Sequence, residues 1–264
     1  MNAYIFPGQG AQFSGMGLDL YENSPLAQEL FEKANEILGF SITDIMFEGS
    51  AEDLKQTKVT QPAIFLHSVI LAKTLGENFK PDMVAGHSLG EFSALVAAGA
   101  IAFEDAVKLV NLRGKLMEKA VPGGAGTMAA IIGMENEQVE EIVASYGDKV
   151  QVANYNCPGQ IVISGETQSV KDACEKFSAA GAKRALVLPV SGPFHSSLMK
   201  PAADELKSEL DKITINEPTI PVVANVTAEY VKSADEIKDL LYQQVYSSVL
   251  WTQSVLKMKS EGVE

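Results

Sequence analysis

The chain has 264 residues, of which 46% are hydrophobic and 21% are charged. This composition is typical of a globular protein, and the length suffices for one large domain or for a domain with a sizeable insertion. The formal net charge of -13 argues against nonspecific binding to nucleic acid or to an anionic membrane, because both require clusters of Lys and Arg.

The cysteines and the N-terminus indicate the compartment. Cys157 and Cys174 are too few for a disulfide framework and lack the spacing of a metal site, which favours a reducing environment. Cys157 is expected in a turn with Pro158 and Gly159. The first residues lack a signal peptide's basic and apolar segments, and no stretch approaches membrane-spanning length. We therefore expect a cytoplasmic protein without a metal site or a bound cofactor.

The first part of the chain alternates strands and helices. Ala3–Phe6 predicts a short strand, and residues 7–17 form a glycine-rich loop that fits neither the dinucleotide-binding nor the ATP-binding pattern. Hydrophobic periodicity predicts helices over 27–38, 63–75, 91–98 and 103–120, with a strand over 83–85. The same alternation returns near the end, with a helix over 201–210, a strand over 222–224 and helices from 234 onward.

The middle of the chain has a different order of elements. Strands are predicted over 127–132, 150–154, 161–164 and 185–188, and helices over 137–146 and 169–180. This β-α-β-β-α-β order is that of a ferredoxin-like unit, and the glycines just before it supply a flexible joint. We therefore predict an α/β protein in which residues 124–189 form a small inserted subdomain and residues 1–123 and 190–264 form the core.

Gly86-His87-Ser88-Leu89-Gly90 places a serine between two glycines directly after the strand predicted over 83–85. This G-x-S-x-G pattern is typical of a nucleophile elbow, a sharp strand-to-helix turn that exposes a serine hydroxyl for acyl transfer. A glycine-serine loop that only caps the following helix fits the same five residues. The pattern alone therefore leaves the role of Ser88 open.

A serine nucleophile needs a base, and the chain has three histidines. His87 adjoins Ser88 on the turn and cannot easily reach back to its hydroxyl, and His67 lies in an apolar helix that favours a structural role. His195 remains, in a loop between a predicted strand and a helix, where catalytic groups are often presented; a helix-capping histidine is the alternative. Because Asp204 lies well along the next helix, a backbone carbonyl is the candidate for orienting His195.

Arg113 lies near the centre of the apolar arc of the helix predicted over 103–120. A guanidinium that points into the interior is costly to desolvate unless it faces an anion. One partner is a protein carboxylate in a buried ion pair. The other is a substrate carboxylate, which the planar guanidinium would hold by two parallel hydrogen bonds.

Six motifs spread over nearly the whole chain carry a resemblance to a known family. They are Phe6-Pro7-Gly8-Gln9-Gly10-Ala11-Gln12, Gln61-Pro62-Ala63, Gly86-His87-Ser88-Leu89-Gly90-Glu91, Arg113-Gly114, the spaced set Asn154, Asn156, Pro158, Gln160, Val162, Ser164 and Gly165, and Phe194-His195-Ser196. Together they resemble the malonyl-CoA:acyl-carrier-protein transacylases of fatty acid and polyketide synthesis. The resemblance implies an α/β-hydrolase-like core that carries a ferredoxin-like insert.

The resemblance also implies roles for individual residues. Ser88 would be the nucleophile and His195 its base, in a ping-pong acyl transfer. The backbone N–H groups of Gln9 and Leu89 would form the oxyanion hole. Arg113 would bind the free carboxylate of the malonyl group.

Two further residues receive roles in the same way. Phe194 resembles the malonyl-selective form of the loop before the histidine, and the main-chain carbonyl of Gln244 would position that histidine. The family usually has proline where this chain has Ser248. Relatives also continue past Glu264 with another strand and helix, so a truncated chain is expected.

The partners implied are malonyl-CoA and an acyl carrier protein, in lipid metabolism, for a protein expected to be monomeric. Because carrier proteins are usually acidic, a local basic surface is needed, for which Lys183, Arg184 and Lys200 are candidates. Two other functions fit parts of the pattern. An acyl hydrolase would use the same serine and histidine but has no use for Arg113, and a non-catalytic docking scaffold would form no covalent adduct.

Overall fold

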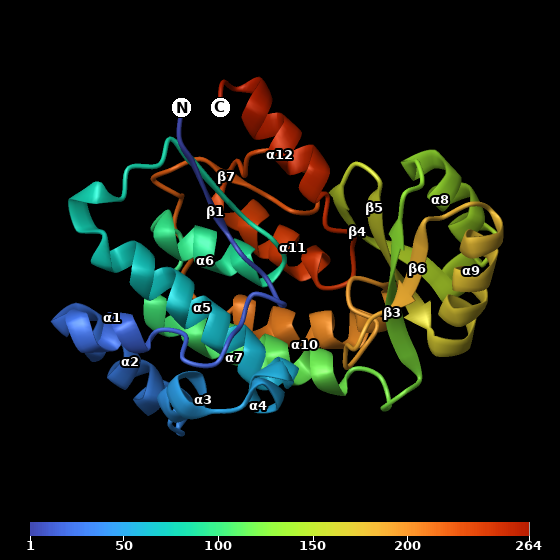
Figure 1. The fold of residues 1–264 in the computed structure, drawn as a ribbon. Helices are drawn as coiled ribbons and strands as arrows, with labels where there is room; N and C mark the ends of the chain where they lie inside the picture. The colour runs from blue at the N-terminus through green and yellow to red at the C-terminus, as the bar shows by residue number, and fades with distance from the viewer. Residues whose placement is uncertain (264) are drawn as a thin grey trace.

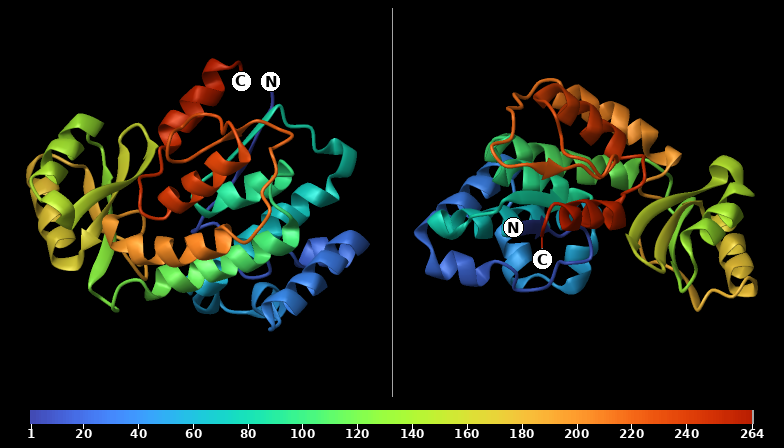
Figure 2. Two further views of the ribbon diagram at one scale, coloured as in Figure 1. Left: turned by 180° about the vertical axis from the view of Figure 1, so that it is seen from behind. Right: turned by 90° about the horizontal axis from the view of Figure 1, so that it is seen from above.

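A computed structural model describes residues 1–263 of the chain, and within them two sheets form (Figure 1). One is a parallel sheet of three strands in the order β1-β2-β7, and the other is an antiparallel sheet of four strands in the order β4-β5-β3-β6. Viewed from above, the antiparallel sheet and its helices lie to one side of the larger helical part (Figure 2). The chain is therefore a mixed α/β protein.

The larger part consists of short parallel strands surrounded by helices. Its strands are β1 (Ala3–Phe6), β2 (Met83–Gly86) and β7 (Val222–Val223). Its helices before the antiparallel sheet are α1 (Leu18–Asn23), α2 (Pro25–Leu38), α3 (Ile42–Glu48), α4 (Ala51–Lys55), α5 (Thr57–Thr74), α6 (Leu89–Ala97) and α7 (Phe103–Lys119). Those after it are α10 (Lys200–Leu210), α11 (Ala234–Gln244) and α12 (Trp251–Ser260).

The antiparallel part follows the predicted β-α-β-β-α-β order. Its elements are β3 (Gly126–Ile132), α8 (Asn136–Ala144), β4 (Val150–Cys157), β5 (Gln160–Glu166), α9 (Thr167–Ala179) and β6 (Arg184–Val187). Apolar residues such as Ile131, Ile163 and Phe177 form a core of its own beneath the two helices. The opposite side of this sheet faces the larger part (Figure 1).

Most predicted elements are confirmed to within a few residues of their ends, but three predictions were incomplete or wrong. Helices α1, α3 and α4 were not predicted, because they are too short to show a clear period. Helix α5 begins at Thr57 rather than at residue 63, with Pro62 inside it. Proline supplies no N–H to the carbonyl four residues earlier, but residues on all sides of this helix are buried, so packing outweighs that loss. Cys157 is the last residue of β4, and Pro158 and Gly159 make the turn.

The described helices include none that is long and apolar enough to cross a membrane. Nor does any group of three or more His, Cys, Asp and Glu side chains within residues 1–263 have an arrangement that could hold a metal ion. Three chain segments instead converge where the two parts meet: the loop after β1, the turn after β2 and the loop after β6. These segments carry Gln9, Ser88 and His195.

Candidate active site

Ser88 occupies the sharp turn between β2 and α6, with a left-handed φ of 51° that is uncommon for a residue with a side chain. Two glycines make the turn possible. A Cβ on Gly86 would overlap the backbone of Gly90, and a Cβ on Gly90 would overlap the carbonyl of Phe6. The close approach of β1, β2 and α6 therefore requires glycine at both positions.

Asn225, which follows β7, holds this turn from the side. Its Oδ1 accepts a hydrogen bond from the Ser88 N–H at 2.6 Å, and its Nδ2 donates to the Gly86 carbonyl at 2.6 Å. Its side chain is 1% exposed. The strained backbone of Ser88 is thus fixed by a buried amide that sequence reasoning did not identify.

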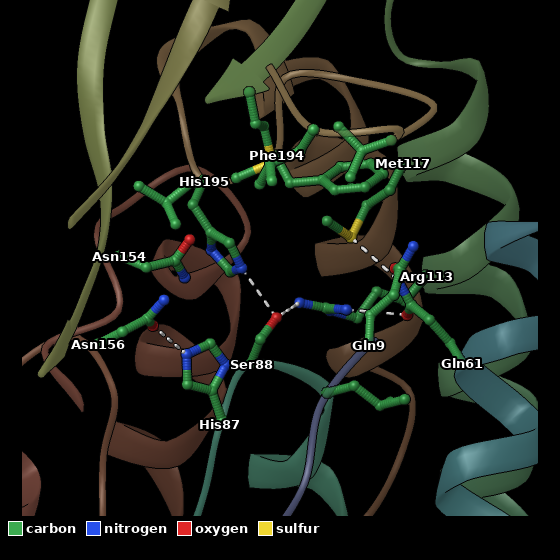
Figure 3. A pocket seen from close by; sticks show the side chains of 15 residues that line it. Gln9, Gln61, His87, Ser88, Arg113, Met117, Asn154, Asn156, Phe194 and His195 are labelled. Atoms are coloured by element: carbon green, nitrogen blue, oxygen red, sulfur yellow. Dashed lines mark hydrogen bonds between the residues drawn. The ribbon is translucent and has the colours of Figure 1, made fainter. Parts of the chain in front are cut away.

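His195 lies against Ser88 in the geometry of a nucleophile and its base (Figure 3). The Ser88 Oγ and the His195 Nε2 are 2.8 Å apart, and the His195 Nδ1 lies 2.8 Å from the main-chain carbonyl of Gln244. Because a carbonyl can only accept, the proton is on Nδ1 and Nε2 is free to take the serine proton. Like Ser88, His195 has a left-handed φ, of 56°.

Burial lowers the pKa of His195 to about 3, and the positive charge of Arg113 acts in the same direction. The hydrogen bond to the Gln244 carbonyl opposes both effects. The imidazole is therefore neutral at physiological pH, as a general base must be. A negative charge placed beside Arg113 would raise this pKa.

Arg113 reaches the site from α7 and is 1% exposed, as its place on the apolar arc predicted. Its Nη1 donates to Gln61 Oε1 at 2.8 Å, and its Nη2 donates to Gln244 Oε1 at 2.9 Å and to Ser88 Oγ at 3.1 Å. Burial lowers the pKa of Arg113 to about 10, which leaves it charged at neutral pH, and Glu91 opposes this shift.

The partners of Arg113 bear on the two roles left open by the sequence. Its hydrogen-bond acceptors are two amide oxygens and one hydroxyl, and no carboxylate within residues 1–263 forms a salt bridge with it. Its Nε has no acceptor in the described part of the chain. The guanidinium is therefore available to an anion that enters the cavity.

Gln9 and Leu89 both line the cavity beside Ser88. Leu89 is the first residue of α6, where an N–H group has no acceptor within the helix. Neither its N–H nor that of Gln9 has an acceptor elsewhere in residues 1–263. Both N–H groups are therefore candidates for the donors of an oxyanion hole.

The cavity has a volume of about 200 Å³, which accommodates a short acyl group. Its floor is polar and comes from the larger part of the molecule, with Ser88, Arg113 and Gln61 (Figure 3). Its roof is apolar, formed by Met117 and Phe194 from the larger part and by Met128, Val162, Leu188 and Val190 from the antiparallel sheet and the loop that leaves it.

His87 also lines the cavity but does not bond to Ser88. Its Nε2 lies 2.9 Å from Asn156 Oδ1 on β4, and its ring contacts Trp251 edge-on. Asn154 lies beside Asn156 on the same wall. Sequence reasoning assigned no role to either asparagine, although both belong to a motif noted above.

Other residues considered as candidates lie elsewhere. The ring of His67 packs edge-on against Phe13. Asp204 is on α10, where Tyr242 donates a hydrogen bond to it. Lys200 forms a salt bridge with Asp204 and contacts the ring of Tyr242.

Comparisons with known proteins identify the family of the chain. Residues 3–262 match the family model described as "Acyl transferase domain". The chain belongs to the acyl transferase family. Among curated relatives, the malonyl CoA-acyl carrier protein transacylase of Bacillus subtilis is 50% identical over 99% of this chain and 84% of the relative. The protein of the same name from Escherichia coli is 48% identical over 99% of this chain and 86% of the relative.

The fold of the chain is also similar to that of solved structures. An acyl carrier protein S-malonyltransferase from Vibrio cholerae has a TM-score of 0.96 and 47% identity, covering 99% of this chain and 87% of that one. A malonyl-transacylase solved in complex with its type II PKS acyl-carrier protein has a TM-score of 0.95 and 44% identity. This match covers 99% of this chain and 86% of that one. This acyl transferase is thus an enzyme of the malonyl CoA-acyl carrier protein transacylase family.

Proposed function

We propose that this acyl transferase moves a malonyl group from malonyl-CoA to the phosphopantetheine thiol of an acyl carrier protein, through a malonyl ester of Ser88. The observation that carries the proposal is the buried guanidinium of Arg113, whose Nη2 lies 3.1 Å from the reactive hydroxyl and which has only neutral hydrogen-bond partners within residues 1–263. A cation in that position suits an acyl group that bears a carboxylate.

In the first half-reaction, His195 Nε2 takes the proton from Ser88 Oγ while this oxygen attacks the thioester carbonyl. The N–H groups of Gln9 and Leu89 stabilise the negative charge that develops on the carbonyl oxygen. The intermediate then collapses, the C–S bond breaks, and His195 gives its proton to the departing coenzyme A thiolate. A malonyl-serine ester remains.

In the second half-reaction, the carrier thiol gives its proton to His195 and its sulfur attacks the ester carbonyl. The same two N–H groups hold the oxyanion. Collapse breaks the bond to Ser88 Oγ, which regains its proton from His195. The main-chain carbonyl of Gln244 keeps the imidazole in the tautomer that both steps need.

Malonyl binding strengthens the base in this mechanism. The carboxylate would offset the charge of Arg113, which lowers the pKa of His195 in the free protein. A neutral acyl group offers no such compensation. The same arginine therefore favours malonyl over acetyl in two ways, through binding and through the basicity of His195.

Two less direct proposals accompany the function. We propose that residues 1–123 and 190–264 form an α/β-hydrolase-like core and that residues 124–189 form a ferredoxin-like subdomain, supported by the strand order β4-β5-β3-β6 and the two helices that pack on this sheet. We also propose that the carrier meets exposed Lys183 and Arg184 rather than Lys200, which is paired with Asp204. Cytoplasmic location and a monomeric state stay predictions.

Intact-protein mass spectrometry tests the function. Wild-type protein mixed with malonyl-CoA should gain the mass of one malonyl group, and adding a holo-carrier protein should remove it with transfer to the carrier. Ser88→Ala should show no adduct. An adduct that survives this substitution would overturn the nucleophile assignment. Release of the acyl group to water rather than to the carrier would instead favour the acyl hydrolase.

A further inference from the structure

One buried charged group has no role in this mechanism. Glu91 lies in the first turn of α6 and is 1% exposed. Its Oε2 accepts a hydrogen bond from Gln244 Nε2 at 2.7 Å and from the Asn225 N–H at 3.3 Å. An acidic residue near a helix N-terminus usually stabilises the helix while exposed to water. Desolvating a fully buried carboxylate costs free energy. The hydrogen bonds that offset part of this cost come from Gln244 and Asn225, two residues of the site.

The side chain of Gln244 links Glu91 to Arg113. Its Nε2 donates to Glu91 Oε2 and, at 2.9 Å, to the Ser88 carbonyl, while its Oε1 accepts from Arg113 Nη2 at 2.9 Å. Both groups facing the nitrogen are acceptors, and the group facing the oxygen can only donate. Turning the amide over would set its nitrogen against the Arg113 guanidinium and its oxygen against the Ser88 carbonyl. It would also set that oxygen against the Glu91 carboxylate whenever Glu91 is ionised.

Resting on the function proposed above, we infer that Glu91 is a positioning residue: it anchors the amide of Gln244 so that the amide oxygen stays against Arg113. It touches neither substrate nor reacting atoms in this scheme. It acts through Gln244 on the guanidinium, and so on the preference for acyl groups that carry a carboxylate.

The surroundings of Arg113 explain why such an anchor matters. The guanidinium is held through its two terminal nitrogens by Gln61, Gln244 and Ser88, and its Nε has no partner within residues 1–263. An incoming carboxylate competes with Ser88 and Gln244 for Nη2. Because Glu91 fixes the Gln244 side chain, the amide nitrogen of Gln244 cannot turn toward Arg113. The amide oxygen therefore stays within hydrogen-bond distance of the guanidinium and holds it in position when the substrate binds.

The charge state of Glu91 also agrees with a role as hydrogen-bond acceptor. Burial raises its pKa to about 7, although the hydrogen bonds from Gln244 and Asn225 and the charge of Arg113 act in the opposite direction. A carboxyl group with this pKa is partly protonated at neutral pH, and its carbonyl oxygen accepts in both forms. A glutamine at this position keeps the same acceptor.

The test compares malonyl with acetyl, because acetyl does not use Arg113. Single-turnover acylation of Ser88 is followed by intact-protein mass spectrometry with each coenzyme A ester. Glu91→Leu, which keeps the volume but removes the acceptor, should lower the malonyl-to-acetyl rate ratio by about tenfold. Glu91→Gln should keep that ratio within about threefold of wild type. A purely structural defect would slow both acyl groups alike.

Ser93→Ala is the matched control, since Ser93 lies on the same helix, is 0% exposed and has a hydroxyl without a partner in the described residues. The malonyl-to-acetyl rate ratio of Ser93→Ala should equal that of wild type. If Glu91→Leu does not fold, Gln244→Met removes the same amide from the other side, keeps the backbone carbonyl that His195 needs, and should lower the ratio similarly.

Two results would overturn the inference: a folded Glu91→Leu or Gln244→Met protein with the wild-type ratio, or a Glu91→Gln protein as impaired as Glu91→Leu. Failure of the proposed function looks different, because wild-type protein would then form no malonyl adduct at Ser88 or would show no preference for malonyl.

Discussion

The floor and the roof of the cavity differ in polarity and in backbone strain. The floor, from the larger part, contains two residues with strained backbone, Ser88 and His195, and buried groups whose polar atoms are nearly all hydrogen-bonded. The roof contributed by the antiparallel sheet is mainly apolar, with Met128 and Val162. Strain and buried charge are costly and persist where the surrounding structure holds them. Under the function proposed above, we expect the floor to perform the chemistry and to select the acyl group, and the roof to supply room and exclude water.

Removing the cation from the floor should have the largest effect. Arg113→Ala should lower kcat/KM for malonyl-CoA by about a hundredfold or more, since a buried charge partner of the substrate is lost. Acetyl transfer should be unchanged or slightly faster, because Arg113 no longer depresses the pKa of His195. Steady-state kinetics with both esters measure this. Equal losses for malonyl and acetyl would mean that Arg113 supports the fold of the floor rather than selecting the substrate.

The pH dependence of the floor should be the next largest effect. As the proposed base, His195 must be unprotonated, and burial and Arg113 lower its pKa to about 3. Protonation should therefore begin to reduce activity only well below the ordinary histidine range. We expect kcat/KM for malonyl-CoA, which reports the free protein, to stay level from about pH 8 down to about pH 5. In Arg113→Ala the acidic limb should move to higher pH. Because the pKa of Glu91 is about 7, the profile is measured in Glu91→Gln as well. An inflection near the ordinary histidine pKa in both proteins would show that the base is more exposed to water than its burial implies.

Sequence reasoning located residues whose signals are local. Ser88 belongs to a five-residue pattern, His195 was found by elimination, and Arg113 interrupts the apolar arc of one helix. Most strands and helices were predictable for the same reason, because hydrophobic period is a local property. These signals do not reveal what the side chains contact.

The residues that were missed act through partners far along the chain. Asn225 binds the backbone of Ser88, 137 positions away, and Glu91 binds Gln244, 153 positions away. Polar side chains in such networks have no period and resemble surface residues in a sequence. The pairing of β2 with β7 and the burial of Pro62 inside α5 were unpredictable for the same reason, since tertiary packing decides both.

A change in the roof should have the smallest effect and tests the comparison from its other side. Val162→Ala enlarges the cavity and removes no polar contact, so malonyl and acetyl transfer should each change by less than about threefold and their ratio should stay constant. The loss of buried methyl groups from a side chain that is 6% exposed should destabilise the protein by about 1 kcal/mol, measured by denaturant unfolding. If Val162→Ala shifted the malonyl-to-acetyl ratio as much as Arg113→Ala, selection would belong to the shape of the whole cavity. Because shape acts on the size of the acyl group and charge acts on its carboxylate, a constant ratio would leave the buried cation of the floor as the selecting group.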